Sequence, residues 1–185
     1  VRGEPPFESE PREIPLGGLY KNISAITAGD LDRDGDLDLY VTQYRPPQDT
    51  MPQRYWDAND GYGNLLLVND GRGGFSDGTV AAGLGAKQFR RTYSSSCVDL
   101  DGDGDLDLVV VSDFCGTDLY LNDGRGRFQD VTDTGLESPR TFGMSHTFAD
   151  YDRDGRLDMF VTGMSSTTSR RLERMAAFPA GYDEA

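Results

Sequence analysis

The chain contains the same acidic nine-residue segment three times, and this repetition constrains the fold more than any other feature of the sequence. The segment reads Asp-Leu-Asp-Arg-Asp-Gly-Asp-Leu-Asp at residues 30–38, and it returns with few changes at residues 99–107 and 150–158. Carboxylates on alternate residues would repel one another strongly unless a cation lay between them. The sixth residue of every copy is glycine, which supplies the backbone freedom of a tight turn. Each copy therefore predicts a cation-binding loop.

Closely spaced oxygen ligands in a flexible loop favour Ca²⁺. The first, third, fifth and ninth residues would supply side-chain oxygens, and the seventh would supply its backbone carbonyl. A carbonyl ligand does not depend on the side chain, so arginine can replace aspartate at the seventh position of the third loop. We predict three calcium sites, formed by Asp30, Asp32, Asp34, Asp36 and Asp38; by Asp99, Asp101, Asp103, Asp105 and Asp107; and by Asp150, Asp152, Asp154, Arg156 and Asp158.

Two other structures could contain an acidic segment of this kind. An EF-hand requires a bidentate glutamate at the twelfth loop residue and a helix on each side. The twelfth residues here are Val41, Val110 and Val161, and strand-forming residues surround them, so the loops are expected to join strands. The other alternative is a solvated acidic turn that binds no metal. Shorter, octahedral coordination would indicate Mg²⁺ instead of Ca²⁺.

Strands are predicted on both sides of each loop. Those that precede the loops, at residues 23–29, 93–98 and 143–149, carry small residues along one face. Small residues on a recurring strand indicate that another backbone comes close, as on the innermost strand of a radial fold. The strands after the loops, such as residues 106–111, are apolar on both faces. Both faces must then be covered, which face-to-face stacking of small sheets achieves.

The first two repeats continue with two more strands. Third strands at residues 64–69 and 117–122 end in the same Asn-Asp-Gly-Arg-Gly turn, and fourth strands start at Phe75 and Phe128. An Asp-Gly pair suits the positive φ of a hairpin turn, and each unit closes with a Gly-Leu pair. The predicted unit is a four-stranded antiparallel sheet with its metal loop between the first two strands.

Successive loops start 69 and 51 residues apart, a spacing that with four strands per unit is typical of β-propeller blades. We expect an all-β chain of about two and a half blades. Because propellers close with about 4–8 blades, we expect this chain to be a segment that further blades or another subunit complete. The expected organisation is an extended lead-in at 1–22, a blade at 23–84 with an insertion at 44–63, a blade at 85–136, a half blade at 137–164 and an irregular tail at 165–185 with a short helix at 170–177.

The Asp loops, the Phe-Gly-Met-Ser segment at residues 142–145 and the Asn-Asp-Gly-x-Gly-x-Phe turns resemble FG-GAP/VCBS repeats, the blades of integrin-α-like propellers. The resemblance covers residues 23–164 and implies side-chain calcium ligands at Asp30, Asp32, Asp34, Asp38 and their equivalents. The tail at residues 165–172 departs from a standard blade and is loosely similar to the UnbV/cartilage-acidic-protein-like branch of these proteins.

The charge of the chain is concentrated in its Asp loops. The formal net charge is −14, and the loops hold 14 of the 32 acidic residues, while 18 acidic and 15 basic residues lie elsewhere. There is no basic stripe for nucleic acid and no apolar run that could span a membrane. Low-affinity calcium modules work where calcium is millimolar, so we expect an extracellular, cell-surface or periplasmic location. The start at Val1 indicates a removed leader or a piece of a longer chain.

Catalysis is not expected, because no nucleophile–base pair is visible. A structural role is favoured for His146, which is the single histidine, and the pairing of Cys97 and Cys115 is left open.

The insertion offers binding candidates on a long loop, with packing against the blade's own rim as the alternative. These candidates are Tyr44, Tyr55, Trp56 and Tyr62, whose rings suit protein or carbohydrate contacts. We expect a calcium-stabilised extracellular propeller segment for binding, adhesion or assembly. A non-catalytic scaffold domain of a larger secreted enzyme is the alternative.

Overall fold

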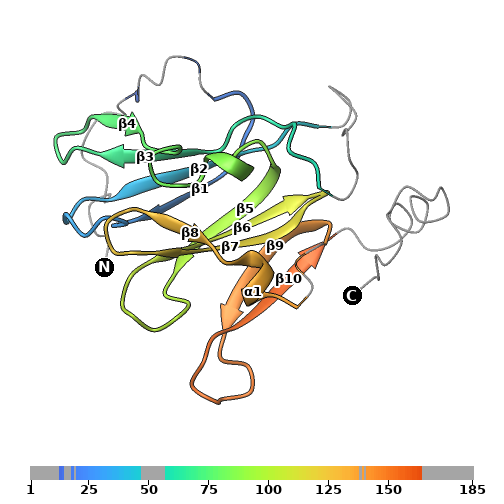
Figure 1. Cartoon of the computed structure of the whole chain (residues 1–185). Coiled ribbons are helices and arrows are strands. Elements are labelled where there is room, and N and C mark those ends of the chain that lie inside the picture. Colours follow the sequence, from blue (N-terminus) through green and yellow to red (C-terminus); the bar gives the residue numbers. More distant parts are fainter. Residues whose placement is uncertain are drawn as a thin grey trace, which may run out of the picture.

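The computed structural model describes residues 13–14, 18, 20–46, 57–137, 139 and 141–163, and in this part of the chain ten strands form three antiparallel sheets (Figure 1). The first sheet contains β1 (Ile23–Gly29), β2 (Asp38–Gln43), β3 (Leu65–Asn69) and β4 (Phe75–Asp77), in that order. The second contains β5 (Arg91–Val98), β6 (Asp107–Asp113), β7 (Gly116–Asn122) and β8 (Phe128–Asp130). The third pairs β9 (Gly143–Ala149) with β10 (Asp158–Gly163). The described helical elements are the 3₁₀ turn η1 (Gly85–Lys87) and α1 (Thr132–Gly135).

The predicted fold class is confirmed: the chain is all-β and its sheets are arranged as propeller blades that do not close into a ring. Strands β1 and β9 have the predicted bounds. Strand β5 begins two residues earlier than expected, because Arg91 and Thr92 pair with the end of β6. The start of the predicted lead-in, residues 47–56 of the insertion and the tail with its expected helix lie outside the described residues.

Strand β6 is apolar on both faces because a neighbouring sheet lies against each face. Leu108 and Val110 belong to a buried cluster with Tyr40 and Leu66 of the first sheet. The residues between them face the other way, where a second cluster joins β6 to β9 and β10 of the third sheet; its members include Val109, Val111, Phe148, Met159 and Val161. Alternation of side chains along a strand sends successive residues to opposite faces. One apolar strand therefore holds three sheets together.

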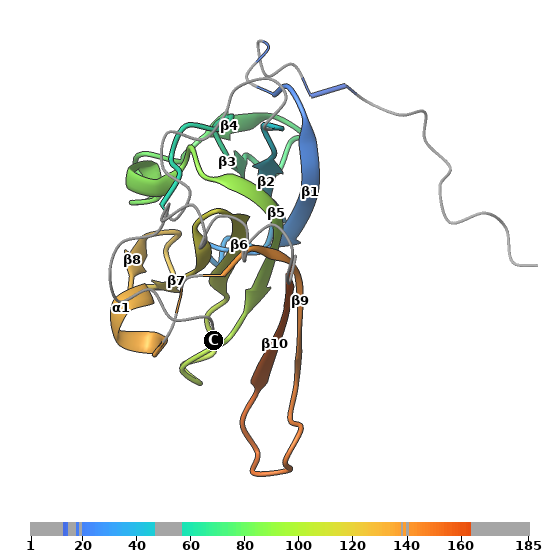
Figure 2. The same ribbon diagram turned by 90° about the vertical axis from the view of Figure 1, so that its right-hand side faces the viewer.

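The innermost strands β1, β5 and β9 lie side by side, as the small residues on them predicted (Figure 2). The Ser24 hydroxyl donates to the carbonyl of Thr92 at 2.7 Å, and the Thr27 hydroxyl donates to that of Ser95 at 2.9 Å. On the other side of β5, the ring of His146 in β9 is hydrogen bonded to the hydroxyls of Ser94 and Ser96. Short hydroxyl side chains thus let neighbouring sheets approach closely at their inner edges.

In the first unit, a close contact with the second sheet explains the glycine of the Gly-Leu pair. Gly83 has φ of +89°, and a Cβ atom there would lie 2.6 Å from the Phe128 carbonyl oxygen of β8. The neighbouring Ala82 carbonyl accepts a hydrogen bond from Phe128 N–H at 2.8 Å. The end of the first unit therefore packs directly on the outer strand of the second, which only glycine permits.

Candidate metal centres in the three Asp loops

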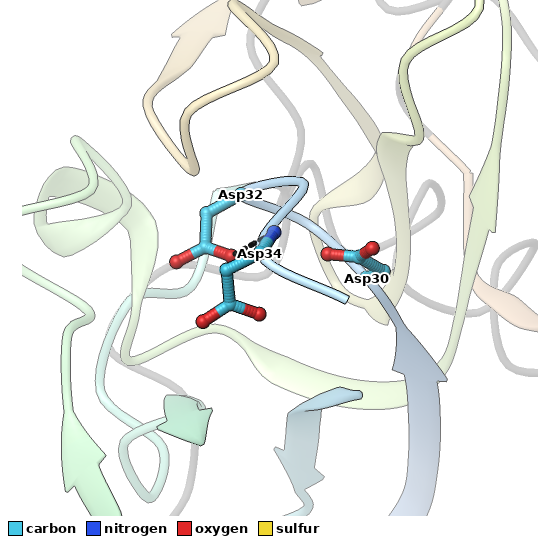
Figure 3. Close-up of side chains that lie close together, drawn as sticks. All are labelled: Asp30, Asp32 and Asp34. Carbon is cyan, nitrogen blue, oxygen red and sulfur yellow. Dashed lines mark hydrogen bonds between the residues drawn. The ribbon is translucent and has the colours of Figure 1, made fainter. Parts of the chain in front are cut away.

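Each Asp loop connects the first two strands of its sheet and brings three carboxylates together. In the first loop, Asp30, Asp32 and Asp34 each offer an oxygen, and these atoms lie within 4.8 Å of one another (Figure 3). The same convergence occurs in the other two loops, in groups formed by Asp99, Asp101 and Asp107 and by Asp150, Asp152 and Asp158. The structure thus gathers predicted residues of every loop at one point, and the ninth residue joins the group in the second and third loops.

Hydrogen bonds from the loop's own backbone hold these carboxylates in place. In the first loop, Asp32 Oδ1 accepts from Asp34 N–H at 3.2 Å, and Asp34 Oδ1 accepts from Asp36 N–H at 2.9 Å. Asp30 Oδ2 accepts from Gly35 N–H at 3.2 Å. Equivalent bonds occur in both other loops. Each carboxylate is fixed by a backbone donor and retains lone pairs for a cation, since an ionised carboxylate has about four acceptor positions.

The loop backbone turns through the left-handed region twice, at the fourth and sixth residues. The sixth was expected, and Gly35 has φ of +94°. The fourth was not, because the first and third loops have arginine there: Arg33 has φ of +60° and Arg153 of +65°, while Gly102 occupies this place in the second loop. A non-glycine residue in this region costs on the order of 1 kcal/mol, so the repeated hydrogen bonds of the loop hold it there.

The ninth aspartate ties its loop to the Asp-Gly turn of the same sheet. Asp107 Oδ2 accepts from Leu100 N–H at 2.7 Å, and its Oδ1 accepts from Asn122 N–H at 2.8 Å. Asp38 makes the matching bonds in the first sheet. Burial raises the pKa of both carboxyls, with these hydrogen bonds opposing the rise. The ninth residue is therefore a structural link as well as a candidate ligand.

The donor set of the first loop fits a hard cation. Asp30 Oδ1 is buried and accepts no hydrogen bond from any residue that the structure describes. Burial, followed by the repulsion of Asp38, raises the pKa of Asp32. A buried oxygen without a donor and crowded carboxylates are both costly without a positive charge nearby. Since all the converging atoms are oxygens, Ca²⁺ suits them better than softer metals.

In the first two loops, the side chain of the seventh residue lies against the Asp-Gly turn of its own sheet. Asp36 lies against Gly71 and Asp105 against Gly124, where an added Cβ atom would meet a carboxylate oxygen within 2.5 Å. The Asp105 carboxylate also forms an ion pair with Arg33 of the first loop. The backbone carbonyl of the seventh residue as a metal ligand stays a prediction.

The predicted binding aromatics are only partly described. The Tyr44 hydroxyl donates to Asp113 Oδ2 at 3.0 Å, and its ring stacks on Tyr93 with centroids 4.2 Å apart. Tyr62 lies beneath Arg45, whose guanidinium carbon is 5.6 Å from the ring centroid. Tyr55 and Trp56 lie outside the described residues. A ligand-binding role for this group stays a prediction, and for Tyr44 the structure adds a contact between the first two sheets.

The histidine ring lies between two serines of the second sheet. His146 Nδ1 is hydrogen bonded to Ser94 at 3.0 Å and Nε2 to Ser96 at 2.8 Å. Burial lowers the pKa of this ring. The ring is thus bonded through both nitrogens and links β9 to β5.

Both cysteines are free thiols, which resolves the pairing that the sequence left open. The Cys115 thiol donates to the Ala58 carbonyl at 2.7 Å. Burial raises the pKa of Cys97 and of Cys115 to about 12, so both thiols are protonated at neutral pH.

A polar cavity of about 200 Å³ at the rim of the second sheet was not expected from the sequence. Buried Asp118 accepts from Lys87 at 2.9 Å and from Arg90 at 2.6 Å, and Arg90 also pairs with Asp57 at 2.7 Å. The positive and negative groups here are paired with one another, and we interpret the cluster as a structural tie between separate segments. Its members are dispersed along the chain, and no motif marks them.

The three sheets lie side by side, and in each sheet a loop with converging carboxylates joins the first two strands. This arrangement defines a β-propeller-like protein with an Asp loop in each described sheet. Residues 99–161 match the family model of an FG-GAP-like repeat, from the start of the second Asp loop into β10. The chain therefore contains an FG-GAP-like repeat. No curated protein matches it, and the finer branch suggested by the tail stays a prediction. Among the described residues, no helix has the length and apolar character needed to cross a membrane.

Proposed function

We propose that this chain is a calcium-stabilised segment of an extracellular β-propeller that serves binding, adhesion or assembly. The observation that supports it best is the convergence of three carboxylates at one point in each of the three loops. A bound Ca²⁺ would supply the positive charge that offsets their mutual repulsion.

The residues that would hold the ion follow from the loop pattern. The first, third, fifth and ninth residues would contribute carboxylate oxygens and the seventh its carbonyl. Because Asp107 also bonds to Asn122 N–H, an ion in the second loop would tie β5, β6 and the β7–β8 turn to one another. The expected role of the metal is structural, as a crosslink that exists only in the folded state.

An extracellular setting follows from the affinity expected for such loops. Open, partly solvated oxygen sites bind calcium in the range that extracellular modules use, where free calcium is millimolar. FG-GAP repeats are typical of extracellular and cell-surface proteins, which supports the same location.

Thermal unfolding with and without calcium tests the proposal. At free calcium one hundred times the dissociation constant, each loaded site stabilises the folded state by about 2.7 kcal/mol, and each kcal/mol raises the Tm by about 2–4 °C for a chain of this length. Asp101→Ala should remove much of the gain of the second loop. Glu137→Ala, which deletes an exposed acid outside the loops, is the matched control and should keep the full gain. Identical melting curves in calcium and in chelator would contradict the proposal and favour metal-free acidic turns.

We also infer that a further sheet covers the open face of the third sheet, as the third sheet covers one face of β6. Phe160 of β10 is 67% exposed, and Met144 of β9 is 41% exposed, which is costly for apolar side chains. Further blades, or another subunit, would bury them. Sedimentation of the 185-residue chain tests this inference: self-association or aggregation is expected, whereas a stable calcium-loaded monomer would overturn it.

A further inference from the structure

An ion pair joins the first two Asp loops. The guanidinium of Arg33, the fourth residue of the first loop, contacts the carboxylate of Asp105, the seventh residue of the second loop. The Arg33 side chain is 54% exposed, but that of Asp105 is only 9% exposed, so the pair is shielded from water on one side. Asp105 N–H donates to Asp103 Oδ1 at 2.8 Å, which links the pair to a candidate ligand of the second loop.

A buried amide bridges the same two loops. Asn122 Nδ2 donates to the Leu31 carbonyl at 2.8 Å and to the Leu106 carbonyl at 3.0 Å. Leu31 stands between the candidate ligands Asp30 and Asp32, and Leu106 directly follows Asp105. One side chain therefore fixes the position of both loops at once.

The turn of the second sheet also packs on the first loop. A Cβ atom at Gly126 would lie 3.4 Å from Asp32 Cβ and 3.9 Å from the Leu31 carbonyl oxygen. At Gly124 in the same turn, a Cβ would lie 2.5 Å from a carboxylate oxygen of Asp105. The Asp105 carboxylate is thus held between its own turn and Arg33.

The same positions differ between the second and third loops. The fourth residue of the second loop is Gly102 and the seventh of the third is Arg156, so this ion pair has no counterpart there. Among the described residues, the ion pair between adjacent loops is therefore specific to the first two loops.

We propose that the first two loops form one coupled cation-binding unit in which Arg33 positions the second loop, while the third loop binds independently. This inference rests on the proposed calcium binding. A cation in the first loop fixes the backbone around Arg33, so the ion pair to Asp105 forms at a smaller entropic cost and the second loop is already ordered when its own ion arrives. Linkage requires the same gain in the opposite direction.

Calcium titration calorimetry of the whole chain tests the coupling, with single loops inactivated through their first residue. Asp30→Ala should abolish binding in the first loop and weaken the second by about five-fold, the lower end of typical coupling between sites. The affinity of the third loop should not change. Conversely, Asp99→Ala should weaken the first loop by a similar factor.

Substitution of Arg33 separates the coupling from the ligands themselves. Arg33→Met keeps every candidate ligand and should weaken the second loop by about five-fold, whereas in the Asp30→Ala background it should cause no further loss. Arg153→Met changes the same loop position in the third sheet and is the matched control. Arg33→Lys keeps the charge and should recover part of the affinity, which also shows that a loss in Arg33→Met is not a folding defect.

The outcomes distinguish the two proposals. If all three loops bind calcium and the second is as tight in Asp30→Ala and Arg33→Met as in the unmodified chain, the coupling is wrong and the calcium proposal stands. If the unmodified chain binds no calcium, the proposed function fails and the coupling fails with it.

Discussion

Strands β6 and β10 follow almost the same Asp loop, yet one is enclosed and the other faces water. All seven residues of β6 are buried, whereas four of the six residues of β10 are exposed. Val109 is fully buried, and Phe160 in the matching place is 67% exposed. Strand β6 pairs with β7 and has a sheet on each face, while β10 pairs with β9 alone among the described residues (Figures 1 and 2).

The loops before these strands nevertheless have the same conformation. Leu100 N–H donates to Asp107, and Tyr151 N–H donates in the same way to Asp158, although Asp107 is buried and Asp158 is exposed. Loop shape is thus set by hydrogen bonds within about nine residues, whereas burial is set by neighbouring sheets. Experiments on matched positions of the two strands can separate these contributions.

The largest difference is expected at the tenth residue counted from the start of each loop. Leu108→Ala in β6 removes a side chain with no exposed surface and should lower the free energy of unfolding by about 2–5 kcal/mol. Met159 of β10 is only half-buried, so Met159→Ala should cost less than half as much, because solvent and side-chain rearrangement fill the space. Urea unfolding measures both values. Equal losses would show that the third sheet is as enclosed as the second.

The burial of β6 should also affect how the stability of the protein depends on pH. Burial raises the pKa of Asp113, at the end of β6, to about 6 from 3.8. The folded state therefore holds this proton more tightly, so the group's stabilising contribution is complete below about pH 4 and is lost as the pH rises through 6. Asp113→Asn should remove this dependence, on the order of 2 kcal/mol. The test is chemical unfolding at pH 4 and pH 7 in chelator. Parallel pH profiles for the two proteins would contradict the enclosed carboxyl.

A smaller effect is expected from the asparagines that precede the two Asp-Gly turns. Asn122 is 6% exposed and bonds to carbonyls of two sheets, so Asn122→Ala leaves acceptors unpaired and should cost about 1–3 kcal/mol. Asn69 is only half-buried and bonds within its own sheet to Leu37, so Asn69→Ala should cost under about 1 kcal/mol. Thermal unfolding of both variants provides the comparison, and a larger loss for Asn69→Ala would refute it.

The smallest effect concerns the seventh residue of the second and third loops. Arg156 places a positive charge where the second loop has Asp105, so the third loop should be the weakest calcium site. Arg156→Asp should tighten it roughly two- to five-fold, in line with about 0.5–1 kcal/mol for an exposed charge pair. Calcium titration of the Arg156→Asp chain measures the change. An unaltered affinity would indicate that the side chain lies too far from the ion to matter.

Much of the fold could be predicted because its signals are local. The Asp loops, the Asp-Gly turns and the strands around them were placed to within two residues, since each depends on hydrogen bonds between neighbours in the sequence. The candidate ligands followed from the same pattern. The contacts between sheets could not be predicted: Arg33 with Asp105, Asn122 with Leu31 and Tyr44 with Asp113 join residues about 70 to 90 positions apart.

The sequence by itself determined the repeating unit: an acidic loop whose carboxylates must converge, between strands whose apolar residues require cover on both faces. Only the tertiary structure decided which strand receives that cover. The β6 side chains are enclosed because a sheet packs on each side, and nearly the same residues in β10 stay exposed. The physical reason is the sequence distance between interacting groups. Backbone hydrogen bonds fix a loop through residues close in the sequence, but burial depends on surfaces that distant parts of the chain supply.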